Sequence, residues 1–414
     1  MNKLENPSFA SDNWSGFCPE ALEYLNRANV GSAPAYGFDD WTARAADAVR
    51  ELFEHDAEVF FVFNGTAANS LALAHLCQPY QATLCHAWSH IETDECGAPG
   101  FFSHGSRLLL GQGEVGKLSL DSAQRLLPKG GDLRFQRPAA LSLTQSTEVG
   151  TLYSADELQS LTQWARGEGI RVHMDGARFM NALVALGLTP AEMSWKAGVD
   201  VLSLGASKLG GGIGDTVIFF DRALARGFDY RCKQAGQLAS KMRLMTAPLL
   251  GLIETGAWQR NARHANACAE YLESRLAEVG IIPAFPRQAN GVFILLTESE
   301  AIALRQLGWS FYISDCHGAA RFMCGWDSQR EWIDRLVGDI KAVASDPEAP
   351  LPGGERGWGE GRVAPERSTP ELPHPAAKPR CSSNAELGSP GFLETGYGSH
   401  RSHPAVYAAS HQPR

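Results

Sequence analysis

Short apolar runs alternate with amphipathic segments over most of the chain. Five of these runs have the length of buried strands, namely EVFFVF (58–63), AALSLTQ (139–145), RVHMD (171–175), DVLSLGA (200–206) and VIFFD (217–221). Intervening segments such as 41–56 and 154–169 place apolar residues at helical spacing, and Ser154 is a candidate N-cap of the second. Strands that alternate with helices in this way predict an α/β fold with a mostly parallel sheet covered on both faces.

The same pattern divides the chain into four parts. Residues 1–40 are rich in Ser, Asn, Gly and Pro and predict an N-terminal arm, followed by a large domain over 41–259. From about residue 260 the pattern changes to a helix, strands at 291–296 and 320–326, and a last helix, which predicts a smaller α+β domain over 260–346. Residues 347–414 hold eleven of the 22 prolines, a composition that buries too little apolar surface to fold, so we expect a disordered extension.

Composition narrows the class of protein. A chain of 414 residues with 44% hydrophobic and 20% charged residues is typical of a globular protein with a sizeable core. A net charge of -9 argues against nucleic-acid binding, and no apolar run is long enough for a transmembrane helix. The nine cysteines form no CxxC pair and the start lacks an apolar signal-peptide core, so we expect a cytoplasmic location. No metal site is expected.

A first candidate binding element is the segment Asn64-Gly65-Thr66-Ala67-Ala68-Asn69. It joins a predicted strand to a predicted helix, and the free N–H groups at the start of a helix suit a phosphate. Small residues allow close approach, and Thr66 adds a hydroxyl donor. The alternative is an ordinary glycine turn with an asparagine cap.

Two further candidates follow later strands. Asp175 ends the run HMD, where it could hold a protonated ring nitrogen, a metal or the partner of a nucleophile, or form a loop salt bridge. Lys208 follows the next strand in SLGASKLGGG, where glycines are expected to keep its surroundings open. Desolvation there would favour the neutral amine that Schiff-base chemistry needs, whereas the alternative is a flexible loop lysine.

The three candidates reinforce one another. A phosphate cradle, a carboxylate after a middle strand and a lysine after a later strand are the parts that pyridoxal 5'-phosphate requires. The lysine would hold the aldehyde, the carboxylate would keep the pyridine nitrogen protonated, and the cradle would anchor the phosphate. The pattern therefore predicts a pyridoxal-phosphate enzyme.

Longer motifs make the interpretation more specific. The chain resembles the low-specificity L-threonine aldolases, in the branch typical of pseudomonads, through FASDNWSG, AYGFDDWTARAAD, FFVFNGTAANSLAL, SHIETDECGAP, LTQSTEVGTLY, HMDGARF and ARFMCGWD. The likeness runs from Phe9 to about Val343. It implies the aspartate-aminotransferase-like fold of fold type I pyridoxal-phosphate enzymes, and a homodimer or homotetramer.

The resemblance also implies roles for matching residues. Lys208 would be the Schiff-base lysine, Asp175 the partner of the pyridine nitrogen, and His90 the histidine that stacks on the ring and serves as acid or base. The remaining matches concern the phosphate (Gly65, Thr66, Arg243), the ring hydroxyl and substrate carboxylate (Arg178), and the substrate (Arg321, Ser11, Tyr36).

The activity implied is retro-aldol cleavage of L-threonine, L-allo-threonine and related L-β-hydroxy-α-amino acids, including phenylserine, to glycine and an aldehyde. His90, or a water that it positions, would remove the hydroxyl proton. Two alternatives stay open: a β-eliminating lyase with the same lysine and aspartate, and a catalytically impaired protein that binds the cofactor without turnover.

Departures from the family pattern bear on the site. Some members carry a histidine where LTQSTEVG stands here, and the nearest matching position is Thr147, which leaves the base for the substrate hydroxyl open. The usual YGDD reads YGFDD, and the glycine before ARF is Ala320, which matters only where φ is positive. Glu95 and Glu148 are interpreted as supporting or helix-capping residues without a catalytic role.

Overall fold

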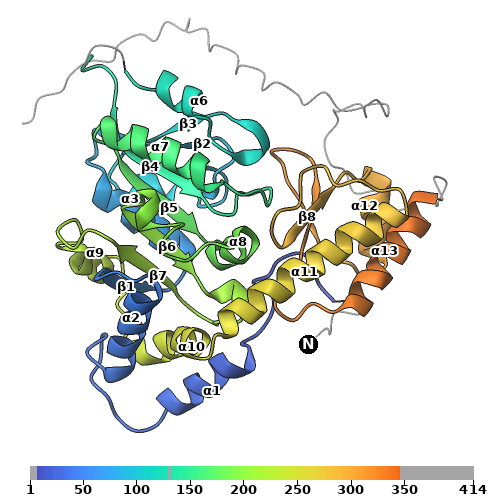
Figure 1. Ribbon diagram of the computed structural model, residues 1–414, viewed down its shortest axis with the longest axis horizontal. Coiled ribbons are helices and arrows are strands. Elements are labelled where there is room, and N and C mark those ends of the chain that lie inside the picture. Colours follow the sequence, from blue (N-terminus) through green and yellow to red (C-terminus); the bar gives the residue numbers. More distant parts are fainter. Residues whose placement is uncertain (1–6, 129–131, 346–414) are drawn as a thin grey trace, which may run out of the picture. The chain divides into compact units, whose positions relative to one another are not determined.

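A seven-stranded sheet forms the centre of the protein (Figure 1). The structure is a computed structural model and describes residues 7–128 and 132–345. The strands lie in the order β1 (Glu58–Val62), β7 (Asp215–Phe219), β6 (Val201–Gly205), β5 (Arg171–Gly176), β4 (Arg137–Thr144), β2 (Gln81–His86) and β3 (Arg107–Gly111). The predicted α/β class with a mostly parallel central sheet is confirmed.

Strand direction brings the ends of several strands to one edge of this sheet. Strands β2 to β6 pair in parallel, whereas β7 is antiparallel to both β1 and β6. Asp215, the first residue of β7, pairs with Val62 at the end of β1 and Gly205 at the end of β6. Residues that follow β5 and β6 therefore lie at the same edge as the start of β7, which is where ligands of α/β sheets bind.

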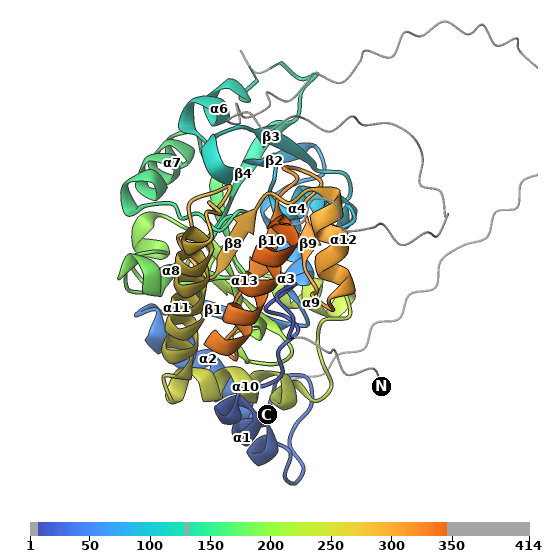
Figure 2. The same cartoon turned by 90° about the vertical axis from the view of Figure 1, so that its right-hand side faces the viewer.

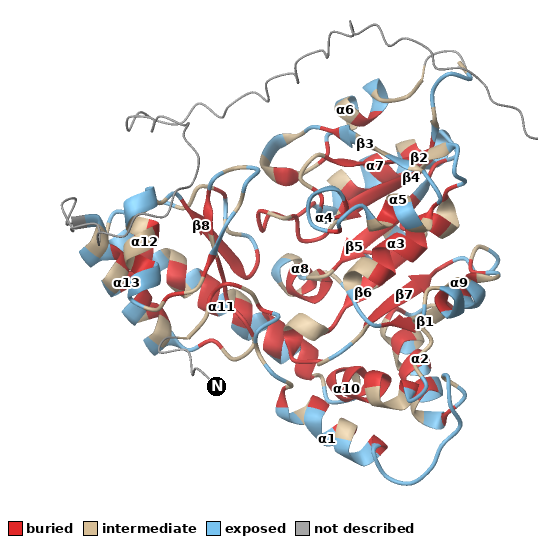
Figure 3. Ribbon diagram, turned by 180° about the vertical axis from the view of Figure 1, so that it is seen from behind, coloured by how far each residue is buried: buried red, intermediate tan, exposed pale blue. Residues whose placement is uncertain are grey.

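Helices cover both faces of the large sheet. Alternate residues of β6 and β7 point to opposite faces: Leu202, Leu204 and Ile218 join one apolar cluster, and Val201 and Val217 join another. The first cluster contains residues of α1 (Pro19–Ala28), α2 (Asp40–Leu52), α7 (Ala155–Gly167), α8 (Phe179–Leu186) and α10 (Met242–Glu254). The second contains residues of α3 (Gly65–Leu76) and α9 (Phe228–Gln234), and the central strands β5, β6 and β7 are almost wholly buried between the layers (Figure 3).

A second, smaller sheet lies in the C-terminal part (Figure 2). It is antiparallel, in the order β8 (Gly291–Ile294), β10 (Ala320–Met323) and β9 (Tyr312–Ile313). Its core includes Trp309 and Phe322 and is closed by α11 (Ala257–Glu278), α12 (Glu298–Gln306) and α13 (Arg330–Ser345). Phe9 belongs to this core, and its carbonyl accepts a hydrogen bond from the Met323 N–H at 2.8 Å, so the N-terminal arm is anchored on the small sheet.

Local sequence explains where several helices begin. The Ser154 hydroxyl and the Glu157 carboxylate form a reciprocal capping box at the start of α7, as expected from Ser154 as N-cap. Helix α11 packs against α8, where the Asn266 side chain donates to the Asn181 carbonyl at 2.9 Å, and against α13. Residue 260, the predicted boundary between domains, lies inside this helix.

Some elements differ from the expectation. The arm contains helix α1, strands β2 and β3 were not predicted, and the strand expected at 217–221 occupies Asp215–Phe219. Two short helices, α4 (His90–Thr93) and α5 (Ala98–Phe102), follow β2, and α6 (Leu120–Arg125) follows β3. Ala320 lies in β10 without a positive φ, so this departure from the family pattern introduces no strain. The expected disordered extension lies outside the described residues, and no helix within them is long and apolar enough to cross a membrane.

Candidate active site

The predicted phosphate cradle lies at the start of α3. The Asn64 side chain caps the helix by accepting the Ala67 N–H at 2.9 Å, and Gly65 is the first helical residue. A Cβ at Gly65 would lie 3.3 Å from Oδ2 of Asp215, so a residue without a side chain lets the helix approach β7 closely. No described residue accepts the N–H groups of Gly65 and Thr66, so the first turn presents two free donors at the ligand edge of the sheet, as an anion site requires.

Asp175 lies near the end of β5 and is buried. Its Oδ1 accepts the Ala177 N–H at 3.0 Å, and its Oδ2 accepts the Asn69 side-chain amide at 2.8 Å. Both carboxylate oxygens are therefore fixed, one by the turn that follows the strand and one by α3. Asn69 belongs to the segment predicted to bind a phosphate, but its contact with Asp175 was not predicted.

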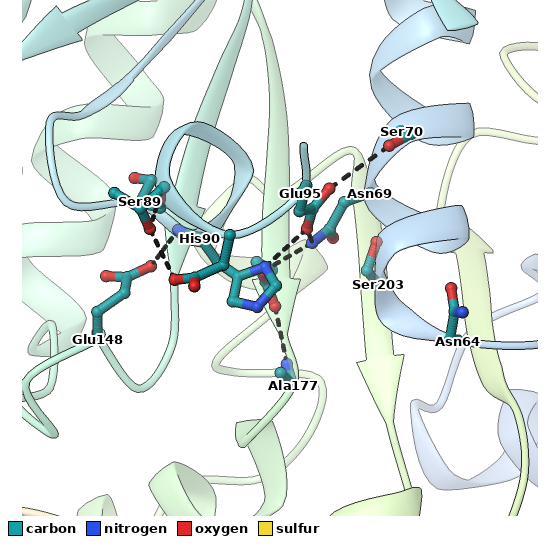
Figure 4. Close-up of polar contacts among 12 residues, drawn as sticks. Asn64, Asn69, Ser70, Ser89, His90, Glu95, Glu148, Ala177 and Ser203 are labelled. Atoms are coloured by element: carbon teal, nitrogen blue, oxygen red, sulfur yellow. Dashed lines mark hydrogen bonds and ion pairs between the residues drawn. The ribbon is translucent and has the colours of Figure 1, made fainter. Parts of the chain in front are cut away.

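His90 is held by a second buried carboxylate, Glu95. Its Nδ1 lies 2.9 Å from Oε1 of Glu95, which also accepts the Asn69 side-chain amide at 2.9 Å. Burial alone would lower the pKa of His90, but the hydrogen bond to Glu95 and the nearby carboxylates outweigh it and raise that pKa. Figure 4 shows His90 between Glu148 on one side and Glu95 with Asn69 on the other. Glu95, expected only to support the site, orients this ring.

Lys208 follows β6 in a short 3-10 turn, Ser207–Leu209. The sequence predicted that the glycines beyond Lys208 keep its surroundings open, and this prediction is wrong. Gly210 and Gly212 have φ values of +84° and +79°, and a Cβ at either would collide with Cys18 or Phe17 of the arm. These glycines instead allow the segment after Lys208 to take a left-handed backbone and to pack closely against the arm.

Asp215 is a further buried carboxyl at this edge that the sequence analysis missed. Its Oδ1 has no hydrogen-bond partner within the described ranges. Burial raises its pKa, while the positive charge of Lys208 acts in the opposite direction. The only sequence signal for Asp215 was its position at the start of an apolar run, which is common for ordinary strand ends.

A buried ion pair connects the arm to the large sheet. Arg178, at the start of α8, donates from Nε and Nη2 to the two oxygens of Asp12, both at 2.8 Å. The Asn290 side chain also donates to Asp12 at 3.0 Å. Although burial alone would raise it, Arg178 holds the pKa of Asp12 below its usual value. Asp12 was not predicted, although its neighbour Ser11 was.

Arg321 approaches the same place from the small sheet. Its Nη2 donates to the Ala10 carbonyl at 3.2 Å, and its buried Nε has no partner among the described residues. Burial and the positive charge of Arg178 lower the pKa of Arg321. The structure therefore brings Ser11, Arg178 and Arg321 together around the arm, and leaves a guanidinium N–H free for an anion.

Tyr36 and Arg243 have a different set of neighbours. The Lys233 ammonium lies 4.5 Å from the centre of the Tyr36 ring. The backbone N–H of Tyr36 donates to the Ser240 carbonyl at 3.3 Å. Arg243 donates to the carbonyls of residues 28 and 31 at 2.9 and 3.1 Å. These contacts join the two residues to the chain around the arm and α10, so their predicted roles at the phosphate and the substrate stay predictions.

The loop after β4 also reaches the site. The Thr147 hydroxyl, the candidate position for a histidine of some relatives, lies 2.7 Å from the Thr151 hydroxyl and is buried. Oε1 of Glu148, the next residue, accepts the His90 N–H at 2.9 Å. Glu148, rather than Thr147, therefore contacts the predicted catalytic histidine, through the backbone N–H of His90.

Similar proteins show the family to which the chain belongs. Residues 8–299 match the beta-eliminating lyase family. The low specificity L-threonine aldolase of Pseudomonas sp. (strain NCIMB 10558) is 53% identical over 82% of this chain and 99% of its own length. That of Pseudomonas aeruginosa is 54% identical over 81% and 97%. The chain therefore belongs to the beta-eliminating lyase family and, within it, to the low-specificity L-threonine aldolases.

Solved structures agree with this fold. A threonine aldolase of Leishmania major aligns with a TM-score of 0.76 at 28% identity, covering 81% of this chain and 99% of that protein. Serine palmitoyltransferase of Sphingomonas wittichii aligns with a TM-score of 0.64 at 14% identity over 83% and 91%, which shows a shared fold alone. The predicted fold type I architecture and family are confirmed.

Enzymes of this family depend on pyridoxal 5'-phosphate, and the residues present fit that group. An amine (Lys208), a fixed carboxylate (Asp175) and a helix N-terminus free of side-chain atoms at Gly65 meet at one sheet edge. The unpartnered Oδ1 of Asp215 and Oε2 of Glu148 add polar atoms without partners in the described structure. This donor set matches an aldehyde, a ring nitrogen and a phosphate.

Proposed function

We propose that this protein cleaves L-threonine, L-allo-threonine and related L-β-hydroxy-α-amino acids, including phenylserine, to glycine and an aldehyde. The proposal is supported by the names of relatives that share more than half of its residues. The single observation that carries it is the meeting of Lys208, Asp175 and His90 with the Arg178–Arg321 pair, because it combines a place for the cofactor with one for an amino-acid carboxylate.

In this proposal, residues of the chain hold the cofactor. Lys208 would bind its aldehyde, Asp175 would keep the proton on its ring nitrogen, His90 would stack on the ring, and the first turn of α3 with Gly65 and Thr66 would bind the phosphate. The cofactor supplies an aldehyde that condenses with amines and a protonated ring that accepts electrons. The Asn69 bridge between Asp175 and Glu95 supports both roles, because it fixes the two carboxylates relative to each other.

Substrate orientation falls to the arginines. Arg321, with its free Nε, and Arg178 bind the α-carboxylate, and Ser11 lies beside them. Holding the carboxylate would fix the orientation of the bond between Cα and Cβ, and such orientation can lower a barrier by about 7–11 kcal/mol in favourable cases. The mutual repulsion of the two guanidinium groups is relieved when an anion binds, which supports this assignment.

A second copy of the chain completes the site in this proposal. Within the part of the chain that the structure describes, the polar and cation–π contacts of Tyr36 and Arg243 are with the segments around residues 28–31 and 233–240. Exposed aromatic side chains in the same region, Tyr36 and Phe38, are suited to contact between subunits. We therefore propose a homodimer or homotetramer in which Tyr36 and Arg243 serve a neighbouring subunit.

A β-eliminating activity is the second candidate, because the family that matches residues 8–299 is named for it. The two reactions differ in products: glycine and an aldehyde for the aldol cleavage, and ammonia and a keto acid for the elimination. Incubating the protein with the cofactor and L-threonine, L-allo-threonine or L-phenylserine, and following both sets of products, tests the proposal. Aldehyde with an equal amount of glycine supports it, and ammonia or no product at all contradicts it.

A further inference from the structure

Glu148 has a side chain with one oxygen bound and one oxygen free. It lies in the loop after β4, whose last residue, Thr144, pairs with Asp175 near the end of β5. Oε1 accepts the backbone N–H of His90 at 2.9 Å, while Oε2 is buried and has no hydrogen-bond partner in the part of the chain that the structure describes (Figure 4). Buried carboxyl oxygens are nearly always paired, so an unpaired oxygen on the residue that binds the backbone of a predicted catalytic histidine is a sign of function.

This carboxyl changes its charge near neutral pH. Burial raises the pKa of Glu148 to about 7, and the negative charge of Asp175 acts in the same direction, against the hydrogen bond from His90. The backbone N–H of His90 binds Glu148, and five titratable groups from the elements around it interact with it electrostatically: Asp175, Arg178, Cys85, Tyr153 and Cys316. Arg178 is the cation among them that opposes the rise.

Neighbouring groups are less suited to accept a proton. The raised pKa of His90 means that its ring keeps a proton to higher pH, and its Nδ1 is bound to Glu95. The hydroxyl of Thr147 is bound to Thr151. A base that works near neutral pH needs a free acceptor atom and a pKa close to that pH. Of these three residues, Glu148 alone has both.

We propose that Glu148 is the base that takes the proton of the substrate β-hydroxyl, an inference that rests on the proposed function. The hydroxyl proton moves to Oε2 as the carbon–oxygen bond becomes a carbonyl. The Cα–Cβ bond breaks, its electron pair stays with Cα, and a proton added there gives glycine. Glu148 then returns its proton to solvent, so charge and atoms balance over one turnover.

This role fixes the direction of the pH dependence. The carboxylate is the active form, so aldehyde release rises as pH increases through the pKa of Glu148 near 7. The removal of a hydroxyl proton matters only for substrates that carry a β-hydroxyl. Exchange of the Cα hydrogen of glycine with solvent needs the cofactor and the rest of the site, but no hydroxyl base.

The test compares Glu148→Gln, Glu148→Asp and a control, Glu92→Gln, on the cofactor-loaded protein. Glutamine keeps an acceptor for the His90 N–H but cannot take a proton, and Glu92 is an exposed residue of α4. The measurements are aldehyde release from L-threonine against pH, glycine Cα exchange in deuterated water, and cofactor absorbance. A fourth measurement, on the protein without cofactor, follows the infrared band of a protonated carboxyl as the pH is raised through neutrality.

We expect Glu148→Gln to keep its cofactor absorbance and its glycine exchange and to lose the infrared band. Its aldehyde release should be about 10²–10⁴-fold slower and should no longer rise with pH near 7. Glu148→Asp should retain part of the rate, and Glu92→Gln should match the wild type. Aldehyde release within about tenfold of wild type, or equal loss of glycine exchange and aldehyde release, overturns the inference. A wild-type protein that exchanges glycine but releases no aldehyde from any substrate overturns the proposed function, and this inference with it.

Discussion

The two halves of the candidate site are built in different ways. The cofactor half, Asp175, Glu95, His90 and Asn69, comes from the large sheet and the helices after its strands, and a continuous set of hydrogen bonds joins its members. The substrate half, Asp12, Arg178 and Arg321, comes from the arm, the large sheet and the small sheet. The substrate half contains two guanidinium groups but one carboxylate.

The difference indicates which ligand each half is suited to bind. Hydrogen bonds within the chain fix the carboxylates of the cofactor half before any ligand binds. The substrate half keeps one unpaired buried N–H and an excess of positive charge, which a substrate carboxylate would neutralise. Changes in the first half should therefore act on the cofactor, and changes in the second on substrate binding and on stability.

Replacing Lys208 should have the largest effect. Lys208→Ala removes the amine predicted to bind the cofactor aldehyde, so we expect loss of both the cofactor absorbance and aldehyde release from L-threonine. The control is Lys196→Ala, because Lys196 lies on the surface 3.1 Å from Glu54. Retention of both signals in Lys208→Ala would remove this residue from its role.

Asp12→Asn should break the substrate half. The variant leaves the buried Arg178 without its charged partner, which typically costs about 3–5 kcal/mol of stability. We expect a lower melting temperature and a higher KM for L-threonine, with cofactor absorbance retained. Because Arg178 lowers the pKa of Asp12, the ion pair stabilises the wild type above the ordinary pKa of aspartate and is lost as the pH falls, so the two proteins should converge in acid. Equal stability at neutral pH would contradict a buried ion pair.

Glu95→Gln should change the cofactor half more subtly. The amide cannot stabilise a charged imidazole as a carboxylate does, so the pKa of His90 should fall back from its raised position. An NMR titration of the His90 ring measures this shift directly. Asp94→Asn is the matched control, since Asp94 is exposed and contributes less to the same pKa. An equal shift in the two variants would show that general charge, and not the 2.9 Å contact, sets the pKa.

The smallest effect is expected from Thr147→Val. Its hydroxyl makes two hydrogen bonds with Thr151 inside the loop, one to the Thr151 hydroxyl and one from the Thr151 N–H, so the variant should lose about 1–3 kcal/mol of stability and keep its pH profile. Unfolding by denaturant and the pH dependence of aldehyde release check the two parts. A large loss of turnover with stability unchanged would give Thr147 the role that the structure assigns to its neighbour.

Residues that follow an apolar strand could be predicted from the sequence. Asp175, Lys208 and the Gly65 turn each stand at a local change from strand to turn, and the topology of an α/β sheet brings such positions to one edge. The capping box at Ser154 is equally local. The resemblance to a family added His90 and Arg321, which have no such local signal.

Partners that are distant along the chain could not be predicted. Asp12 lies 166 residues from Arg178, and Asn69 lies 106 residues from Asp175, so no spacing rule connects them. Strand β2 mixes polar and apolar residues, and the apolar run of β3 is only three leucines long between Arg107 and Gly111, which is too short to predict a strand by itself. Helix α1 has no side-chain cap and owes its place to packing against α10.

Covalent trapping tests the central claim most directly. The protein is incubated with pyridoxal 5'-phosphate, reduced with borohydride, digested and mapped by mass spectrometry. The account predicts that the label lies on the peptide containing Lys208, and that L-threonine added before reduction lowers its yield. A label on another lysine, or none, would contradict the assignment of this sheet edge as the active site.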